Sequence, residues 1–203
     1  MKIIHVTDTH FIPAGQTLYG RDPATALERC IADINRNHPD AERCVITGDL
    51  THWGEPEAFD HLKQHLDQLK VPLRLLVGNH DNRDIFRQRF GDHPCDENGF
   101  IQSVEDLPVG RFIYLDTNKP GHHEGWYCEQ RMQWLEEQFA AAKGKDLYLF
   151  MHHPPFDIGI PALDRISLVQ KGAFSEVVKP HRDQIRHLFF GHIHRPLSGS
   201  WLG

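Results

Sequence analysis

The sequence is short of the features that mark secreted and membrane-spanning proteins. Its four cysteines include no C-x-x-C pair, and we interpret them as buried, reduced thiols in a reducing cytoplasm. No stretch approaches the roughly 20 apolar residues of a membrane span. The opening run from Met1 to Val6 is too short for the apolar core of a signal peptide and is typical of a first strand. The sequence therefore predicts a cytoplasmic protein that is not associated with a membrane.

Basic residues are also few. Lysine and arginine number 22 against 28 aspartates and glutamates, so the formal net charge is −6 and a long nucleic acid is not an expected partner. The chain has no internal repeat, and its 203 residues are enough for one domain with a sizeable core. We therefore predict a single domain spanning residues 1–203. Histidine is abundant, with 16 residues, of which about half are expected at the surface.

Strand-like runs alternate with helical patterns along the chain. Short apolar runs predict strands at residues 3–6, 45–46, 73–77, 112–115, 147–151 and 188–190. Amphipathic spacing predicts helices that begin at Asp22, cover Phe59 to Leu69, and span residues 83–90, 129–142 and 167–178. This alternation predicts an α/β fold covered by helices on both faces, with its binding site at the carboxyl ends of the strands.

Five short motifs stand where these apolar runs end. They are Asp8-Thr9-His10, Gly48-Asp49, Gly78-Asn79-His80-Asp81, His152-His153-Pro154-Pro155 and Gly191-His192-Ile193-His194. Together they supply carboxylate, amide and imidazole ligands, a set suited to two metal ions held close together. Two metals that share a hydroxide are suited to attack on phosphorus, so the motifs indicate phosphoester hydrolysis.

Spacing within the motifs predicts which side chains share a metal. Residues i and i+2 of an extended segment point the same way, so Asp8 and His10 should reach one metal, a polar turn being the alternative. His192 and His194 repeat this spacing, which favours a metal site over a pair of surface histidines. Asp49 is the expected bridge, because a carboxylate can bind two cations through its two oxygens.

The third and fourth motifs add an amide and further imidazoles. Asn79 offers a neutral amide oxygen, although a turn-capping side chain is the alternative. His80 is placed to donate a proton to a leaving oxygen, with Asp81 orienting its imidazole. The adjacent His152 and His153 should point to opposite sides of a strand end, so only one of them is expected to bind the metal.

In this order the motifs resemble the calcineurin-like metallophosphoesterase superfamily, whose pattern is D-x-H, GD, GNH, H-x-P and GHxH. The resemblance covers nearly the whole chain and implies a four-layer α-β-β-α sandwich of two mixed sheets. Within the superfamily the chain looks like bacterial class III cyclic-nucleotide phosphodiesterases and related glycerophosphodiesterases. The further segments that carry this likeness are Leu18-Tyr19-Gly20, Gly54-Glu55-Pro56-Glu57, Gly125-Trp126 and Trp134-Leu135-Glu136.

The resemblance also implies roles for individual residues. A first metal would be bound by Asp8, His10, Asp49 and His194, and a second by Asp49, Asn79, His152 and His192. The cofactors would be two divalent or trivalent ions of iron, manganese, zinc or cobalt. Asn79 and His80 would contact the substrate, with His80 as the catalytic acid or charge stabiliser and His153 in a supporting role.

Two departures from related families narrow the expected substrate. Purple acid phosphatases place a metal-binding tyrosine three residues after the GD aspartate, where this chain has His52, so a tyrosine–iron centre is disfavoured. Ser/Thr protein phosphatases carry an arginine shortly after the GD motif, and the stretch from Leu50 to Gly54 has none. A site without that arginine suits a singly charged phosphodiester better than a phosphomonoester.

The end of the chain is a third departure. It stops nine residues after His194, whereas strands after GHxH usually complete the second sheet in this superfamily. Residues 196–203 predict at most one short strand, so the fold is expected to lack C-terminal strands, either as a truncated chain or as a compact variant with a more open site. A homo-oligomer is left open.

The main hypothesis is a dinuclear metal-dependent phosphodiesterase. It would hydrolyse a small diester, a 3′,5′-cyclic nucleotide or a glycerophosphodiester, by in-line attack of a hydroxide that bridges the metals. One alternative is a non-catalytic scaffold of the same fold, and another is a nuclease or nucleotide pyrophosphatase of the same superfamily. Side chains near enough to the motifs to line a pocket are Phe11, Tyr19, His52, Trp53 and Phe156.

Overall fold

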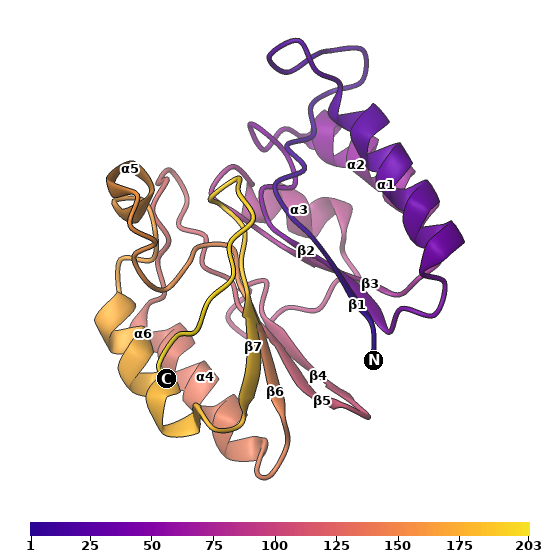
Figure 1. Ribbon diagram of the computed structural model, residues 1–203. Coiled ribbons are helices and arrows are strands. Elements are labelled where there is room, and N and C mark those ends of the chain that lie inside the picture. Colours follow the sequence, from indigo (N-terminus) through magenta and orange to yellow (C-terminus); the bar gives the residue numbers. More distant parts are fainter.

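Two β-sheets lie face to face between two layers of helices (Figure 1). The structure is a computed structural model and describes all residues from Met1 to Gly203. The first sheet has the order β1 (Ile3–Val6), β2 (Arg43–Thr47) and β3 (Leu73–Leu76). The second has the order β4 (Ser103–Leu107), β5 (Gly110–Tyr114), β6 (Leu147–Phe150) and β7 (Ile185–Phe189).

Each sheet is covered on its outer face by helices. Over the first sheet lie α1 (Pro23–Asn37), α2 (Pro56–Leu66) and α3 (Arg83–Arg89). Over the second lie α4 (Glu129–Ala141) and α6 (Lys171–Val178), with the short α5 (Pro161–Asp164) before α6 and a 3₁₀ turn, η1 (Lys179–His181), after it. Helix α1 begins as expected, because the Asp22 side chain accepts a hydrogen bond from the Ala24 N–H at 3.0 Å and Pro23 follows at the first helical position.

Three apolar layers hold these elements together. The layer between the sheets is largely aromatic and consists of Val45, Leu76, Phe112, Tyr114, Tyr148 and Phe150. The two outer layers lie between each sheet and its helices, and each contains 13 buried residues. The predicted four-layer α-β-β-α sandwich is therefore confirmed.

The topology corrects one detail of the prediction, since only the second sheet is mixed. The three strands of the first sheet run parallel, because each is joined to the next by a connection that contains a helix, α1 or α2. In the second sheet β4 is antiparallel to β5, while β5, β6 and β7 are parallel. Residues 107–110 close a tight hairpin between β4 and β5, and β4 is a strand that the sequence patterns missed.

The structure bears on three further features: membrane-spanning helices, the cysteines and the C-terminal segment. No helix is both long and apolar enough to cross a membrane. All four cysteines are free. Cys44 is buried, Cys30 and Cys128 are half-buried, and Cys95 is exposed, so the prediction of buried thiols holds fully only for Cys44. No strand follows Phe189, and Trp201 and Leu202 pack instead against the apolar layer between the second sheet and its helices.

Candidate metal centre

The loops that follow β1, β2, β3, β6 and β7 meet at one edge of the sandwich. Backbone hydrogen bonds join them beyond the strands, with the Asp8 N–H donating to the Gly48 carbonyl at 3.1 Å and the His10 N–H to the Asp49 carbonyl at 2.9 Å. On the other sheet the Gly191 N–H donates to the His152 carbonyl at 3.0 Å. All five motifs therefore lie together at the carboxyl ends of the strands.

One group of side chains gathers around the end of β1. The ligand atoms of Asp8, His10, Asp49 and His194 all lie within 4.8 Å of one another. His10 Nε2 is 3.1 Å from His194 Nε2 and 3.7 Å from Asp49 Oδ2. These four residues are the set that the resemblance assigns to a first metal, and the structure brings them together.

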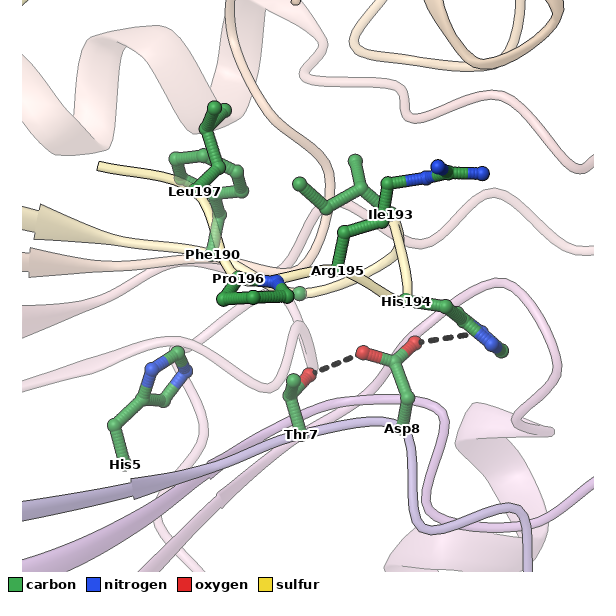
Figure 2. A pocket seen from close by; sticks show the side chains of 10 residues that line it. His5, Thr7, Asp8, Phe190, Ile193, His194, Arg195, Pro196 and Leu197 are labelled. Atoms are coloured by element: carbon green, nitrogen blue, oxygen red, sulfur yellow. Dashed lines mark hydrogen bonds and ion pairs between the residues drawn. The ribbon is translucent and has the colours of Figure 1, made fainter. Parts of the chain in front are cut away.

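Asp8 is held from two sides, as Figure 2 shows. The Thr7 hydroxyl donates to one carboxylate oxygen at 2.7 Å, and His194 Nε2 lies 3.3 Å from the other. Beside them is an open depression of about 490 Å³ that is lined from both sheets, by residues near the end of β1 and by the segment after β7. The group therefore borders open space and is within reach of a small molecule.

A second group gathers around the end of β6. His152 Nε2 lies 3.2 Å from Asp49 Oδ1 and 3.2 Å from Asn79 Oδ1. His192 Nδ1 lies 2.9 Å from the same amide oxygen. The His152 Nδ1–H donates to the Thr47 carbonyl at 2.9 Å, which turns Nε2 toward Asp49 and Asn79. Asp49 therefore faces both groups, with Oδ2 toward His10 and Oδ1 toward His152.

The chemistry of these atoms fits metal ions. Two carboxylates, an amide oxygen and four imidazoles converge, so electron lone pairs outnumber the protons available to share between them. Mixed nitrogen and oxygen donors of this kind suit manganese, iron, cobalt and zinc. His192 shows the shortage of partners directly, because its buried Nε2 has no hydrogen-bond partner.

The charges within the centre are set by burial and by the carboxylates. Burial alone would raise the pKa of Asp49. The neighbouring His152, His80 and His10 outweigh burial and bring the pKa well below its usual value, so the carboxyl is ionised. Burial lowers the pKa of His152, and the charge of Asp49 outweighs that effect and raises the pKa to about 9. Burial is the main cause that lowers the pKa of His10 and of His192 to about 4. Metal binding at His152 must therefore displace a proton.

The backbone around the predicted ligands is unusual. Five of the seven have positive φ angles, in the left-handed region that non-glycine residues rarely adopt: Asp8 (56°), His10 (45°), Asp49 (48°), His192 (71°) and His194 (50°). The assumption of extended segments at Asp8–His10 and His192–His194 is therefore wrong. Left-handed turns instead aim His192 at one group and His194 at the other. Conformations of this kind carry strain and concentrate at functional sites.

Three glycines in the motifs make room for the predicted ligands. A Cβ on Gly48 would lie 2.7 Å from His152 Nδ1, and one on Gly78 would collide with the Asp49 side chain. A Cβ on Gly191 would collide with Thr7 and lie 2.8 Å from Asp8 Oδ2. The glycine that opens each of these three motifs is thus required because side chains of the centre pack directly on its backbone.

His80 is oriented differently from the prediction. Its Nδ1–H donates to the His52 carbonyl at 2.7 Å, and its ring stacks on the His52 ring with 4.9 Å between centroids. The predicted orientation by Asp81 is wrong. The Asp81 carboxylate instead accepts hydrogen bonds from Leu50 N–H, Thr51 N–H, the Thr51 hydroxyl and Gly78 N–H. Asp81 therefore fastens the loop after β2 to the loop after β3.

A sixth polar segment, which the sequence analysis overlooked, supports the centre from the end of β5. Asn118 Nδ2 donates to the Asp81 carbonyl at 3.1 Å and also to the Gly78 carbonyl. The Thr117 hydroxyl lies 2.7 Å from His153 Nδ1, and His153 Nε2–H donates to the His123 carbonyl. His153 is thus buried in a supporting position. The position of residues 116–118 directly after a strand is the same pattern that revealed the other motifs.

Comparisons with solved structures match the fold. A purple acid phosphatase from yellow lupin superimposes with a TM-score of 0.70 at 15% identity, over 95% of this chain and 37% of that chain. A putative 5′-nucleotidase from Staphylococcus aureus superimposes with a TM-score of 0.56 at 14% identity, over 98% of this chain and 46% of that chain. At these identities the likeness concerns the fold alone.

Comparisons with curated sequences are more specific. The chain is 44% identical to a probable cyclic nucleotide phosphodiesterase of Rhodopseudomonas palustris, over 100% of this chain and 75% of that protein. It is 33% identical to a probable glycerophosphodiester phosphodiesterase of Arcobacter nitrofigilis, over 99% of this chain and 74% of that protein. The model of the calcineurin-like phosphoesterase family matches residues 1–196. Taken with the geometry of the centre, these matches show that the chain belongs to the calcineurin-like phosphoesterase family.

Proposed function

We propose that this protein is a metal-dependent phosphodiesterase that hydrolyses small phosphodiesters, and that it works with two metal ions held by the centre described above. The single observation that carries the proposal is the position of Asp49 between the two groups of side chains, with one carboxylate oxygen toward each. A carboxylate so placed can bind two cations and reduce the repulsion between them. The names of the two curated relatives support diesters as the substrate class.

The ligand sets follow from the two groups. Asp8, His10, Asp49 and His194 would hold the first ion, and Asp49, Asn79, His152 and His192 the second. When bound, such ions supply a nucleophilic water near neutral pH and neutralise charge on the phosphoryl oxygens. The donor set suits iron, manganese, zinc or cobalt.

The protein would contribute a proton donor of its own at His80. Because His80 Nδ1–H is committed to the His52 carbonyl, Nε2 is the nitrogen left to face a substrate. A protonated Nε2 beside the phosphate would stabilise its charge and protonate the departing alkoxide. No arginine follows Asp49 between residues 50 and 54, which favours a singly charged diester over a doubly charged monoester.

The test is hydrolysis of a substrate panel after chelation and re-addition of manganese, zinc or iron. The panel contains 3′,5′-cyclic AMP, glycerophosphoethanolamine, bis(p-nitrophenyl) phosphate and p-nitrophenyl phosphate. We expect diester hydrolysis that returns with metal and exceeds hydrolysis of the monoester. Protein that binds two ions and hydrolyses none of the diesters would contradict the proposal and support a non-catalytic scaffold.

A further inference from the structure

Two large aromatic side chains are exposed on this protein. Tyr19 is 87% exposed and Trp53 is 62% exposed, whereas every other phenylalanine, tyrosine and tryptophan is buried or half-buried. A folded chain usually buries most of its aromatic surface, because burial of an aromatic ring is strongly favourable. The two exceptions therefore call for a physical reason.

Both exposed rings contact the same histidine. The Trp53 ring lies edge to face with the His52 ring at 4.4 Å between centroids, and the Tyr19 ring does so at 5.9 Å. His52 also contacts His80, whose ring is stacked nearly parallel to it at an angle of 21°. His52 Nδ1 also lies 3.2 Å from His10 Nδ1. Tyr19, His52 and Trp53 thus form a continuous aromatic platform that leads from open solvent to the edge of the metal centre.

The backbone at Tyr19 points to the same conclusion. Leu18 and Arg21 pair in a tight turn, whose two central residues, Tyr19 and Gly20, have φ angles of 49° and 74°. Glycine, asparagine and aspartate are the residues that fit such a turn without strain. A bulky tyrosine in the left-handed region is disfavoured there, and its exposed ring recovers little by burial. This turn holds a ring beside His52 at a cost to its own stability.

We propose that Tyr19 and Trp53 stack against the nucleobase of a cyclic nucleotide whose phosphate lies at the metal centre, an inference that rests on the proposed phosphodiesterase function. A nucleobase offers flat faces that stack on aromatic side chains, whereas glycerol and ethanolamine groups offer none. His52 connects the platform to His80, so a base on the platform and a phosphate beside His80 are near neighbours. The platform would favour cyclic nucleotides over glycerophosphodiesters.

The test compares two substrates in the metal-reconstituted enzyme. We expect Tyr19→Ala and Trp53→Ala each to lower the ratio of kcat/KM for 3′,5′-cyclic AMP to kcat/KM for glycerophosphoethanolamine by about tenfold, the loss typical of one stacked base. The loss should lie mainly in KM, because stacking on a remote base holds substrate and transition state alike. Tyr19→Phe and Trp53→Phe keep a ring and should retain most of the ratio. Val169→Ala, which truncates an exposed apolar side chain elsewhere, serves as the matched control.

A ratio within about twofold of wild type in both alanine variants, or equal losses on both substrates, would overturn the platform. Tyr19→Gly separates the ring from the strain of the turn, because glycine accepts a positive φ, and it should lower the ratio as Tyr19→Ala does. A wild-type enzyme that hydrolyses neither substrate would contradict the proposed function rather than the platform. In that case the affinity of the metal-loaded variants for 5′-AMP, measured by calorimetry with glycerol 3-phosphate as the reference ligand, tests the platform without catalysis. The platform predicts that Tyr19→Ala and Trp53→Ala weaken binding of 5′-AMP but not of glycerol 3-phosphate.

Discussion

At the scale of single residues, the protein concentrates several tasks on Asp49. Its two oxygens face His10 and His152, and Oδ1 also accepts the His80 N–H at 3.0 Å. Asp49→Ala removes all of these contacts, so we expect both metals to be lost and diesterase activity to fall by at least about a thousandfold. Metal content by mass spectrometry and turnover of bis(p-nitrophenyl) phosphate check this.

A substitution at His80 is the control for Asp49→Ala, because it should remove activity without removing metal. In the predicted ligand sets its side chain binds neither metal, so His80→Asn should keep two ions per chain while activity falls by about a hundredfold or more through loss of the proton donor. Two retained ions in Asp49→Ala, or wild-type turnover by that variant, would refute the bridging assignment.

At the scale of elements, the loop after β3 needs a glycine for space rather than for an unusual backbone conformation. Gly78 does not have a positive φ, yet an added Cβ would collide with Asp49 and lie 2.8 Å from His152 Cε1. We expect Gly78→Ala to lower the free energy of unfolding by about 1–3 kcal/mol and to weaken metal binding, as overpacking does in a filled core. Chemical denaturation and metal titration measure the two effects.

Gly172 is the matched control for this steric argument. It lies in the first turn of α6, and a Cβ there would meet no atom within 4 Å. Alanine restricts the unfolded chain and favours helix, so Gly172→Ala should leave the free energy of unfolding unchanged or raise it by up to about 1 kcal/mol. Equal losses of stability in Gly172→Ala and Gly78→Ala would show that packing against the centre is not the cause.

The loop after α3 is fastened to β3 by a histidine with a fixed tautomer. His93 Nε2 accepts the Leu75 N–H at 3.1 Å, and Nδ1–H donates to the Pro94 carbonyl at 3.1 Å. Burial, and then the charge of Arg74, lower the pKa of His93 to about 4. Because this pKa lies below the value of about 6.5 in the unfolded chain, the unfolded state takes up the proton first as pH falls. This contribution to stability is complete above pH 6.5 and is lost between about pH 6.5 and pH 4.

His93→Gln isolates this contribution, since an amide oxygen can still accept the Leu75 N–H but does not titrate. Between pH 7 and pH 4.5 we expect wild type to lose about 2 kcal/mol more unfolding free energy than the variant. Urea denaturation at a series of pH values measures the difference. Parallel pH profiles for the two proteins would show that His93 does not contribute.

The elements also show which features of the fold the sequence reveals. Strands buried on both faces are apolar throughout, as in β6, where all four residues are buried, so they are recognisable as short apolar runs. The edge strand β4 reads Ser-Val-Glu-Asp-Leu, has no fully buried residue, and carries no such pattern. The left-handed turns at Asp8, His10 and His192 leave no trace either, because their conformation is imposed by packing among distant loops.

At the scale of the whole molecule, the centre joins the two halves of the sandwich. Its side chains come from loops after β1, β2 and β3 on one sheet and after β6 and β7 on the other. The five motifs that hold these side chains all stand just after strands, and their order along the chain allowed the sequence to predict that they lie together. The supporting residues Thr117 and Asn118 were missed because their partners are backbone groups and a histidine far away in sequence.

Removal of metal should therefore destabilise the entire fold rather than one loop. Without ions, the lone pairs of the carboxylates and imidazoles face one another, and five of the residues keep a strained backbone. Bound ions would be held by side chains from both sheets and would link them. A ligand that binds only the folded state adds about 2.7 kcal/mol at 100 times its Kd, which in a chain of this size raises Tm by about 5–10 °C for each site. We expect chelation to lower Tm by at least that amount in calorimetry and re-addition of manganese or zinc to restore it. Asp49→Ala should show the same Tm with and without metal. If the wild-type protein binds two ions and its Tm does not change on chelation, the centre does not link the two sheets structurally.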